Sequence, residues 1–479
     1  MDAQKTAAIA AVDSIAEQIC RLSDAIWEVP ELGFHETQSA KLQCALLEEL
    51  GFRVETNLGN IPTAFSGRWG SGKPVVGILG EFDALAGLSQ KAGVAVQDPV
   101  IPGGDGHGCG HNLLGSGSIA AAYAIKEYLR ATGKSGTVIY YGCPAEEGGS
   151  GKAFMARDGV FDELDFAFGW HPGTVNQVGS DSSLANYAVR YRFKGSSAHA
   201  AAAPHLGRSA LDAVELMNVG VQFLREHVPT SVRIHYAITD SGGVSPNVVQ
   251  ANAEVFYMIR AEKIALVQKI YERVNKIAQG AATMTETEVE IILEKACSDL
   301  LVHQHLNDVL QANMEEIPLY ELTQEDLAFA QEIRDSQEVQ AVPCTGFLKH
   351  LPTDKAAWLR QQPKEPVCNF VIPRIYHMGV SPASGDIGDV SYVCPTAEIY
   401  TATWASGTSA HTWRATAQGK SGVAHKAMLF AGKVLAGAAI DLLNDPEKLV
   451  LAKEEHAELT GHKPFVSPIP KDVPLPLWG

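Results

Sequence analysis

The stretch KPVVGILGEFDAL, residues 73–85, begins as a short apolar strand and ends in two acids, Glu81 and Asp83. Its length and its Val, Ile and Leu content are typical of a strand that is buried on both faces of a parallel sheet. In such sheets ligands bind beyond the carboxyl ends of the strands. The stretch therefore predicts both a fold class and the edge of the sheet at which a site lies.

Two further stretches repeat this pattern, GTVIYYGCPAEEGG at 136–149 and DFAFGWHPG at 165–173. The first ends with Glu146 and Glu147, and the second carries His171. Helical stretches separate the strands, which predicts an α/β fold with a mostly parallel sheet flanked by helices. Because each strand ends in polar side chains, we expect these side chains to meet in one shared site.

The pattern changes near residue 187. A strand–helix–strand–strand–helix–strand order follows, which predicts a smaller inserted α+β domain of ferredoxin-like type. We therefore expect a first catalytic part at 1–186, the inserted domain at 187–297 and a second catalytic part at 298–479. Within the last part, an extra segment at about 300–378 is charged and irregular, and its sequence indicates no chemistry.

The composition excludes several classes of partner. The 479 residues carry a formal net charge of -17 and a sequence pI of about 5.4, whereas nucleic acids and anionic membranes require a positive surface. The first 20 residues suggest an amphipathic helix rather than a signal peptide, and no run of 18 apolar residues occurs. With eight cysteines and no C-x-x-C spacing, the sequence predicts a cytoplasmic protein with reduced thiols.

The stretch GDGHGCGHN, residues 104–112, is a loop, because four glycines in nine residues disfavour helix and strand. Together with donors elsewhere, it predicts a metal centre whose candidate ligands are Cys109, His111, Glu147, His171 and His411. Sulfur, imidazole and carboxylate donors suit zinc, manganese or cobalt rather than calcium or magnesium. Five donors exceed what one tetrahedral ion keeps with an open position, so we expect two ions.

Each candidate also has a structural alternative. A single histidine is more often structural than a ligand, Cys109 alone would be a small buried apolar residue, and adjacent glutamates are usually solvated. However, Glu146 and Glu147 directly follow an apolar strand, where a surface pair is poorly explained. One carboxylate can bind an ion while its neighbour moves a proton, and the residues alone leave open which does which.

Six motifs in order resemble those of the co-catalytic metallopeptidase-like amidohydrolases, the group that includes aminoacylases and acetylornithine deacetylase. The motifs are GEFDALAGL, GHGCGHN, CPAEEGGSGK, GWHPG, KGSSAHAAAAPHLGRSALDA and SPNVVQANAEVFYMIR. The Cys-Gly-His form of the loop is similar to that of the auxin-conjugate and hippurate hydrolase branch. The resemblance extends over nearly the whole chain.

This resemblance implies two divalent ions per subunit, zinc or manganese, on the five candidate ligands. It also implies that Glu146 is the general base and that Asp83 orients a ligand. His107 is not at a ligand position of the group, and we expect it beside the ligands rather than on a metal. Most of the superfamily has Asp where this chain has His171 and His where it has Glu81, which leaves the metal's identity open.

The inserted domain would be a dimerisation or lid domain, so a homodimer is expected, with a second related subunit as an open possibility. His199 resembles a histidine that enters the partner's active site and stabilises the oxyanion; the alternative is a loop or capping histidine. Asn247 and Arg260 resemble the pair that holds the substrate's α-carboxylate; the alternative for Arg260 is a surface strand residue.

The activity implied is hydrolysis of the amide of a small N-acyl amino acid, with 4-aminobenzoyl-glutamate as the expected substrate and 4-aminobenzoate and glutamate as products. Lid closure would complete the site. Other aromatic N-acyl amino acids such as auxin–aspartate, an aminoacylase-like activity or a dipeptidase are the enzymatic alternatives. A non-catalytic or partner-dependent subunit is the alternative of another class.

Overall fold

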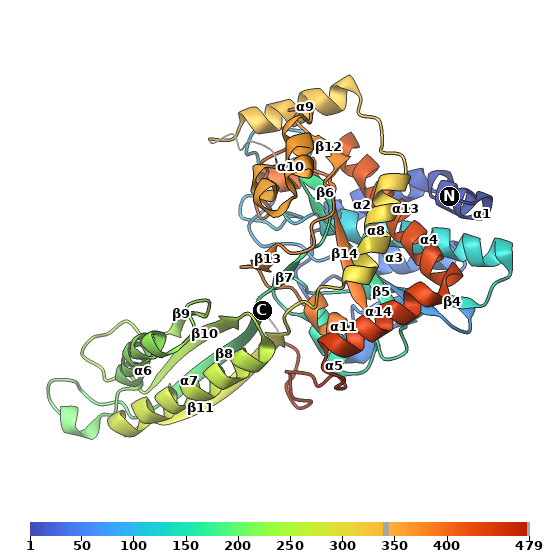
Figure 1. Ribbon diagram of the computed structural model, residues 1–479. Helices are drawn as coiled ribbons and strands as arrows, with labels where there is room; N and C mark the ends of the chain where they lie inside the picture. The colour runs from blue at the N-terminus through green and yellow to red at the C-terminus, as the bar shows by residue number, and fades with distance from the viewer. Residues whose placement is uncertain (339–343, 477–479) are drawn as a thin grey trace.

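An eight-stranded sheet organises most of the chain (Figure 1). The computed structural model describes residues 1–338 and 344–476. From edge to edge the strands are β1 (Arg53–Thr56), β2 (Phe65–Ser71), β4 (Gly136–Cys143), β3 (Val75–Glu81), β5 (Phe166–Gly173), β14 (Thr396–Ala402), β6 (Val175–Val178) and β12 (Cys368–Val371). The four central strands, β4, β3, β5 and β14, run parallel.

The flanking strands make the sheet mixed rather than uniformly parallel. β1, β2 and β4 pair antiparallel at one side, and β14 and β6 pair antiparallel at the other. The α/β class with a flanked sheet is confirmed, and its parallel part is the central part. Because β4, β3, β5 and β14 are neighbours, their carboxyl ends lie at one edge of the sheet, as the strand-end acids predicted.

Helices cover both faces of this sheet. The helices of this part of the chain are α1 (Ala3–Ser14), α2 (Ala16–Glu28), α3 (Thr37–Glu49), α4 (His111–Thr132), α5 (Gly151–Arg157), α8 (Gln304–Glu316), α9 (Gln324–Asp335), α10 (Thr353–Arg360), α11 (Ile387–Val393), α12 (Trp413–Gln418), α13 (Gly422–Asn444) and α14 (Pro446–Leu459), with short 3₁₀ turns η1 (Leu58–Asn60) and η4 (Thr345–His350). α4 and α13 pack at backbone contact, since a Cβ at Gly432 would lie 2.9 Å from the Gly117 carbonyl oxygen.

Helix α13 has the length and apolar composition of a membrane span, although 72% of its most apolar window is buried. It packs against α4, β5 and β14, so it is a core helix of this domain. At the other end of the chain, the N-terminal helical stretch is divided into α1 and α2 at Ile15. All eight cysteines are free thiols, as expected.

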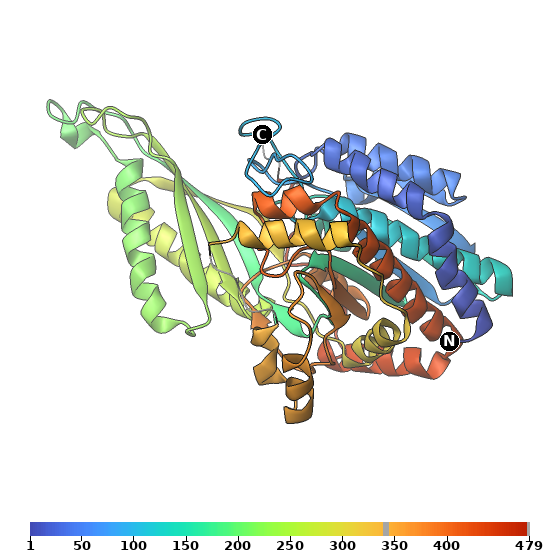
Figure 2. The same cartoon turned by 90° about the horizontal axis from the view of Figure 1, so that it is seen from above.

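A second sheet projects from the first part (Figures 1 and 2). Its antiparallel strands are, in spatial order, β11 (Glu288–Cys297), β8 (Ala185–Lys194), β10 (Asn252–Ala261) and β9 (Arg233–Asp240). One face is covered by α6 (Ala210–Leu224) and α7 (Ile264–Thr285), with the 3₁₀ turns η2 (Pro204–Leu206) and η3 (Arg225–His227) nearby. The predicted strand and helix order is observed, while the exact domain boundaries at 186 and 297 stay predictions.

The segment at about 300–378, predicted to be irregular, contains regular structure in its described residues. It forms α8, α9, α10 and β12, and α8 enters the core through Leu306, Leu310 and Met314. The prediction was wrong because the charged residues between these positions hide a helical spacing of apolar ones. A two-stranded sheet of β7 (Asp181–Ser183) and β13 (Gly379–Ser381) lies beside the cavity described below.

Candidate metal centre

The predicted donors meet beyond the carboxyl ends of the central strands. Glu81 ends β3, the Glu146–Glu147 pair follows β4, and His171 lies in the last part of β5. They line a cavity of about 400 Å³ together with Cys109 and His411. The expectation that separate strand ends build one shared site therefore agrees with this geometry.

Glycines shape the loop that presents Cys109 and His111. A Cβ at Gly106 would lie only 2.1 Å from the Leu88 carbonyl oxygen, so only glycine fits where the loop crosses residues 85–89. Gly110, with φ of 76°, turns the chain into α4, which places His111 at the first position of the helix. The backbone N–H of His411 donates to the Gly108 carbonyl at 2.9 Å, which fixes that late segment against the loop.

Two of the three groups of potential ligand atoms among the described residues share a thiol. Cys109, His111 and His171 form one group and Cys109, Glu147 and His411 the other, with all atoms of a group within 4.8 Å of one another. Cys109 Sγ lies 3.5 Å from His171 Nε2, and His411 Nε2 lies 3.2 Å from Glu147 Oε1. Because Cys109 belongs to both groups, its sulfur would be a donor common to both halves of the site.

Buried atoms without partners show that these residues fit divalent cations. Among the described residues, His111 Nε2 and Glu147 Oε1 are buried and accept or donate no hydrogen bond. A buried polar atom without a partner is costly, and a cation among these donors would satisfy both. The mixture of sulfur, nitrogen and carboxylate oxygen is one that binds zinc or manganese rather than calcium.

Asp83 lies behind the ligands and connects the two groups. Its Oδ1 is 2.8 Å from His111 Nδ1, and its Oδ2 accepts the backbone N–H of Glu147 at 2.9 Å. Asp83 is 1% exposed. Because Asp83 contacts Nδ1, Nε2 of His111 is the ring nitrogen that remains for a metal ion, so the orienting role of Asp83 stays a prediction that fits this contact.

The two adjacent glutamates have opposite electrostatic environments. Burial, together with the charges of Glu81 and Asp386, raises the pKa of Glu146 well above its usual value. Burial also raises the pKa of Glu147, but the contact with His411 and the charge of His111 outweigh it and lower that pKa to about 2. The pair is therefore suited to one carboxylate that stays ionised as a ligand, Glu147, and one that carries a proton, Glu146.

Burial shifts the pKa values of the thiol and of the loop's other histidine, His107, toward their neutral forms. Burial raises the pKa of the Cys109 thiol, so Cys109 needs a cation beside it to act as a thiolate. His107 Nε2 lies 3.1 Å from the Ile26 carbonyl oxygen, and burial with the charge of His111 lowers its pKa to about 3. His107 belongs to neither ligand group; it is a neutral residue that ties the loop to α2.

The residues predicted to contact substrate are spread along the second sheet. Arg260 Nη1 donates to Ser384 Oγ at 3.2 Å, and Ser384 lines the cavity. His199 is exposed, and its Nδ1 accepts the backbone N–H groups of Ala201 and Ala202. This cap-like contact leaves Nε2 as the donor of the neutral ring. His199 does not line the cavity of its own chain.

Asn247 and Arg260 lie near opposite ends of β10 rather than side by side. The Asn247 carbonyl accepts the N–H of Ala200 in the loop beyond the strand, while Arg260 pairs with Asn186 at the other end. Strands rise about 3.3 Å per residue, so roughly 25 Å separates the two ends. The structure thus does not bring the predicted carboxylate clamp together within one chain.

Four residues of the site region were not singled out from the sequence: Lys152, Asp386, Glu398 and Tyr400. The first two are fully buried and paired, and the last two line the cavity from β14. Glu398 is the one charged residue of β14, two positions before Tyr400, and a charge within a mostly buried strand is a signal already present in the sequence. Lys152 is the last residue of the motif CPAEEGGSGK, and nothing in that motif indicates that the lysine pairs with a distant carboxylate.

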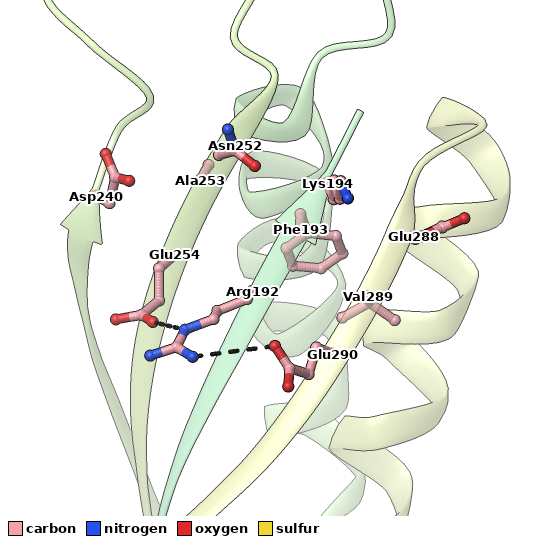
Figure 3. Close-up of a pocket in the computed structure, with 10 residues that line it drawn as sticks. All are labelled: Arg192, Phe193, Lys194, Asp240, Asn252, Ala253, Glu254, Glu288, Val289 and Glu290. Carbon is pink, nitrogen blue, oxygen red and sulfur yellow. Dashed lines mark hydrogen bonds and ion pairs between the residues drawn. The ribbon is translucent and has the colours of Figure 1, made fainter. Parts of the chain in front are cut away.

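A second depression, of about 550 Å³, lies on the open face of the second sheet (Figure 3). Arg192 at its centre contacts Glu254 at 2.5 Å and Glu290 at 4.0 Å. Its lining contains no cysteine or histidine. Arg192 pairs with two of its carboxylates, and the depression offers neither the thiol nor the imidazoles found in the first cavity.

Comparison with known proteins places this geometry in a family. The family model of "Peptidase family M20/M25/M40" matches residues 78–365. One of the p-aminobenzoyl-glutamate hydrolase subunits of Escherichia coli K12 is 46% identical over 98% of both chains. The mouse Xaa-Arg dipeptidase is 31% identical over 58% of this chain and 63% of its own. The family resemblance drawn from the sequence motifs is thereby confirmed.

Solved structures agree on the fold. An aminobenzoyl-glutamate utilization protein from Klebsiella pneumoniae superposes with a TM-score of 0.60 at 18% identity, covering 91% of this chain and 98% of its own. A dinuclear metal binding peptidase of the M20 family from Bacillus subtilis gives a TM-score of 0.54 at 17% identity, covering 90% and 99%.

Proposed function

Because the chain belongs to peptidase family M20/M25/M40 and is an amide-hydrolysing enzyme, we propose that it cleaves 4-aminobenzoyl-glutamate into 4-aminobenzoate and glutamate. The relative named for this reaction is 46% identical to the chain over almost its full length. The observation that carries the proposal is that four of the five metal donors and Glu146 line one cavity, while the fifth donor, His111, groups with Cys109 and His171.

The centre would hold two divalent ions, zinc or manganese, on Cys109, His111, Glu147, His171 and His411. When bound, such ions polarise a carbonyl group and make water more acidic. Glu146, when ionised, accepts the proton of the attacking water and passes it to the leaving nitrogen; its raised pKa makes the carboxylate a stronger base than an ordinary glutamate. Asp83 holds His111 in the orientation that the ligand needs.

The two ends of the cavity match the two ends of this substrate. The guanidinium of Arg260 reaches the lining residue Ser384, and its buried Nε has no hydrogen-bond partner, so a substrate carboxylate would complete it. Tyr400 lies with its ring 5.8 Å from that of His171 and donates to Glu398 at 3.1 Å. The ring of Tyr400 can pack against an aminobenzoyl ring, and the carboxylate of Glu398 can accept a hydrogen bond from its amino group.

We further propose that the chain works as a homodimer in the cytoplasm. β9 is an edge strand with Tyr236 and Ile238 exposed, and α6 exposes Val219 and Phe223, the latter 71% exposed. These apolar side chains lie on the part of the molecule that carries His199. Association there would supply His199 to the partner's cavity, in which the chain's own His199 is absent.

A related but different chain is the alternative partner. Escherichia coli K12 has another p-aminobenzoyl-glutamate hydrolase subunit, which is 29% identical to this chain over 55% of it and 61% of its own length. A chain of that kind shares the family's motifs, so it could take the place of the second copy at the same edge strand.

The test uses the purified chain loaded with Zn²⁺ or Mn²⁺. We expect 4-aminobenzoyl-glutamate to be hydrolysed faster than acetyl-amino acids, auxin–aspartate or an Xaa-Arg dipeptide. Faster turnover of the dipeptide would replace the proposed substrate. No hydrolysis with any metal, restored by adding the related subunit, would instead favour a partner-dependent chain. Light scattering of the Phe223→Glu variant against wild type tests the dimer.

A further inference from the structure

A fully buried lysine lies directly behind the metal centre. Lys152 is 0% exposed, and its Nζ lies 2.6 Å from Glu81 Oε1 and also binds Asp386 Oδ1. The backbone N–H of Lys152 donates to the other oxygen of Asp386 at 2.8 Å. We call Glu81, Lys152 and Asp386 the buried triad. Its net formal charge is negative, and of the three only Glu81 was expected at the shared site from the sequence.

The triad fixes one oxygen of Glu81 and leaves the other toward the metal donors. Oε1 is held by Lys152, whereas Oε2 is buried and makes no hydrogen bond. Oε2 lies 3.2 Å from His111 Nε2, which also makes none. Two buried polar atoms that make no hydrogen bond therefore face each other.

That separation is typical of two ligands on one ion. Zinc binds nitrogen and oxygen at about 2.1 Å, so two such ligands lie roughly 3.0 to 3.4 Å apart. Glu81, His111 and Glu146 also form a third group of potential ligand atoms within 4.8 Å of one another. Oε2 of Glu81 makes no hydrogen bond, and the nearest ion-pair contact given for it is to Nε2 of His111, so a cation bound by both atoms would satisfy them.

We propose that Glu81 is a sixth ligand of the metal centre, on the ion held by His111, and that Lys152 is the positioning residue that aims it. The inference rests on the proposed two-ion centre but not on the substrate. Lys152 takes part in no chemical step: it turns Oε2 of Glu81 toward the cavity and compensates part of the charge of two buried carboxylates.

Lys152 also joins the segments that surround the site. It follows the Glu146–Glu147 loop at the start of α5, and Asp386 follows Gly385, whose added Cβ would lie 3.4 Å from Glu146 Oε1. The triad therefore couples the end of β3, the loop after β4 and the segment before α11. We therefore expect a substitution of Lys152 to change metal affinity more than it changes the rest of the fold.

The test measures zinc binding rather than turnover. Wild type, Glu81→Gln and Lys152→Met are stripped of metal, titrated with Zn²⁺ against a chromophoric chelator and analysed for bound metal after gel filtration. We expect Glu81→Gln to weaken one of two zinc sites about 10- to 100-fold and to retain about one ion per chain. Lys152→Met should weaken the same site in the same direction.

The control and the double variant separate positioning from mere stability. Lys453→Met removes a lysine that pairs with Asp165 outside the cavity, and it should leave both zinc affinities within twofold. Glu81→Gln/Lys152→Met should bind zinc no more weakly than Glu81→Gln alone, because both changes remove the same ligand. Circular dichroism of each metal-free variant reports whether it is folded.

Two zinc sites of wild-type affinity in folded Glu81→Gln would overturn the proposal. Equal zinc binding by Lys152→Met and wild type, with a lower melting temperature, would show that Lys152 is structural only. If Lys152→Met does not fold, Lys152→Arg and Glu81→Gln decide the question. A protein that binds two ions and loses one in Glu81→Gln, yet does not cleave 4-aminobenzoyl-glutamate, would refute the proposed substrate and leave this inference standing.

Discussion

Asp83 Oδ1 lies 2.8 Å from Nδ1 of His111 at the base of the cavity. The other oxygen of the same carboxylate accepts the backbone N–H of Glu147 at 2.9 Å. One buried aspartate thus orients a histidine on α4 and the loop that follows β4. The two groups of ligands are therefore coupled through Asp83 as well as through Cys109.

Asp83→Asn tests this coupling. An amide has the same shape, but it can accept through only one atom and presents an N–H₂ group to either His111 or Glu147. We expect zinc affinity to fall about 10- to 100-fold with the fold retained, as is common when the residue behind a ligand is changed. Chelator competition and circular dichroism provide the two measurements. Zinc affinity within twofold of wild type would contradict an orienting role.

Glu146→Gln tests the assignment of the two glutamates. Removal of the proton carrier should lower kcat about 10²- to 10⁴-fold, while the metal content stays at the wild-type level. Glu147→Gln is the matched control, and it should lose metal because its carboxylate is a ligand. Elemental analysis beside steady-state kinetics gives both readouts. Loss of metal in Glu146→Gln instead would mean that the two roles are exchanged.

The central strands and their polar ends could be predicted from the sequence because each feature is local. A buried apolar strand that ends in acids, as at Glu81 and Asp83, needs no knowledge of distant residues. The same holds for the glycine loop around Cys109. Parallel strands then bring these ends together by a general rule of α/β folds, so the cluster followed from local patterns.

The remaining features depend on contacts that sequence spacing does not contain. Lys152 and Asp386 are far apart in the chain and meet only because α5 and α11 pack together. Asn247 and Arg260 are 13 positions apart, but β10 holds them at opposite ends of the second sheet. Helix α8 was missed because its apolar positions are separated by charged and polar ones.

Subunit exchange tests the predicted role of His199 across a dimer. His199→Ala and Glu146→Gln should each be nearly inactive alone. In a mixed dimer the His199→Ala chain keeps its Glu146 and receives His199 from its partner, so one site is complete. Random re-association should restore about a quarter of wild-type activity. No recovery after verified exchange would mean that His199 acts within its own chain or is only a loop residue.

Glu398→Gln tests recognition of the aminobenzoyl group. Burial raises the pKa of Glu398 to about 7, so above that pH it is an ionised acceptor beside Tyr400. We expect kcat/KM for 4-aminobenzoyl-glutamate to fall about 3- to 10-fold at pH 8, the size of one hydrogen bond. Benzoyl-glutamate lacks the amino group and is the matched control, whose kcat/KM should change little. An equal loss of kcat/KM for both substrates would show that Glu398 does not bind the amino group.

His425 and Asp24 provide a prediction for stability against pH that is independent of the metal. His425 Nε2 lies 2.9 Å from Asp24 Oδ1, between α13 and α2. Burial lowers the pKa of His425, but the bonds to Asp24 and Cys20 outweigh it and raise that pKa to about 9. Because the folded-state pKa exceeds the unfolded value of about 6.5, the protonated pair stabilises the fold fully below pH 6.5. The contribution is lost as the pH rises through 9.

Asp24→Asn should therefore lower the free energy of unfolding by about 1 to 2 kcal/mol at pH 6 and by almost nothing at pH 9.5. The value at pH 6 is reduced because both side chains of the pair are partly exposed to solvent. Urea unfolding of the metal-free protein at both pH values measures the difference. Lys433→Met, which breaks the pair with Asp13 between α13 and α1, is the control, because this pair also joins α13 to an N-terminal helix but contains no histidine. Its effect should be similar at pH 6 and pH 8.5. An Asp24→Asn effect that does not shrink between pH 6 and 9.5 would show that His425 does not titrate with the fold.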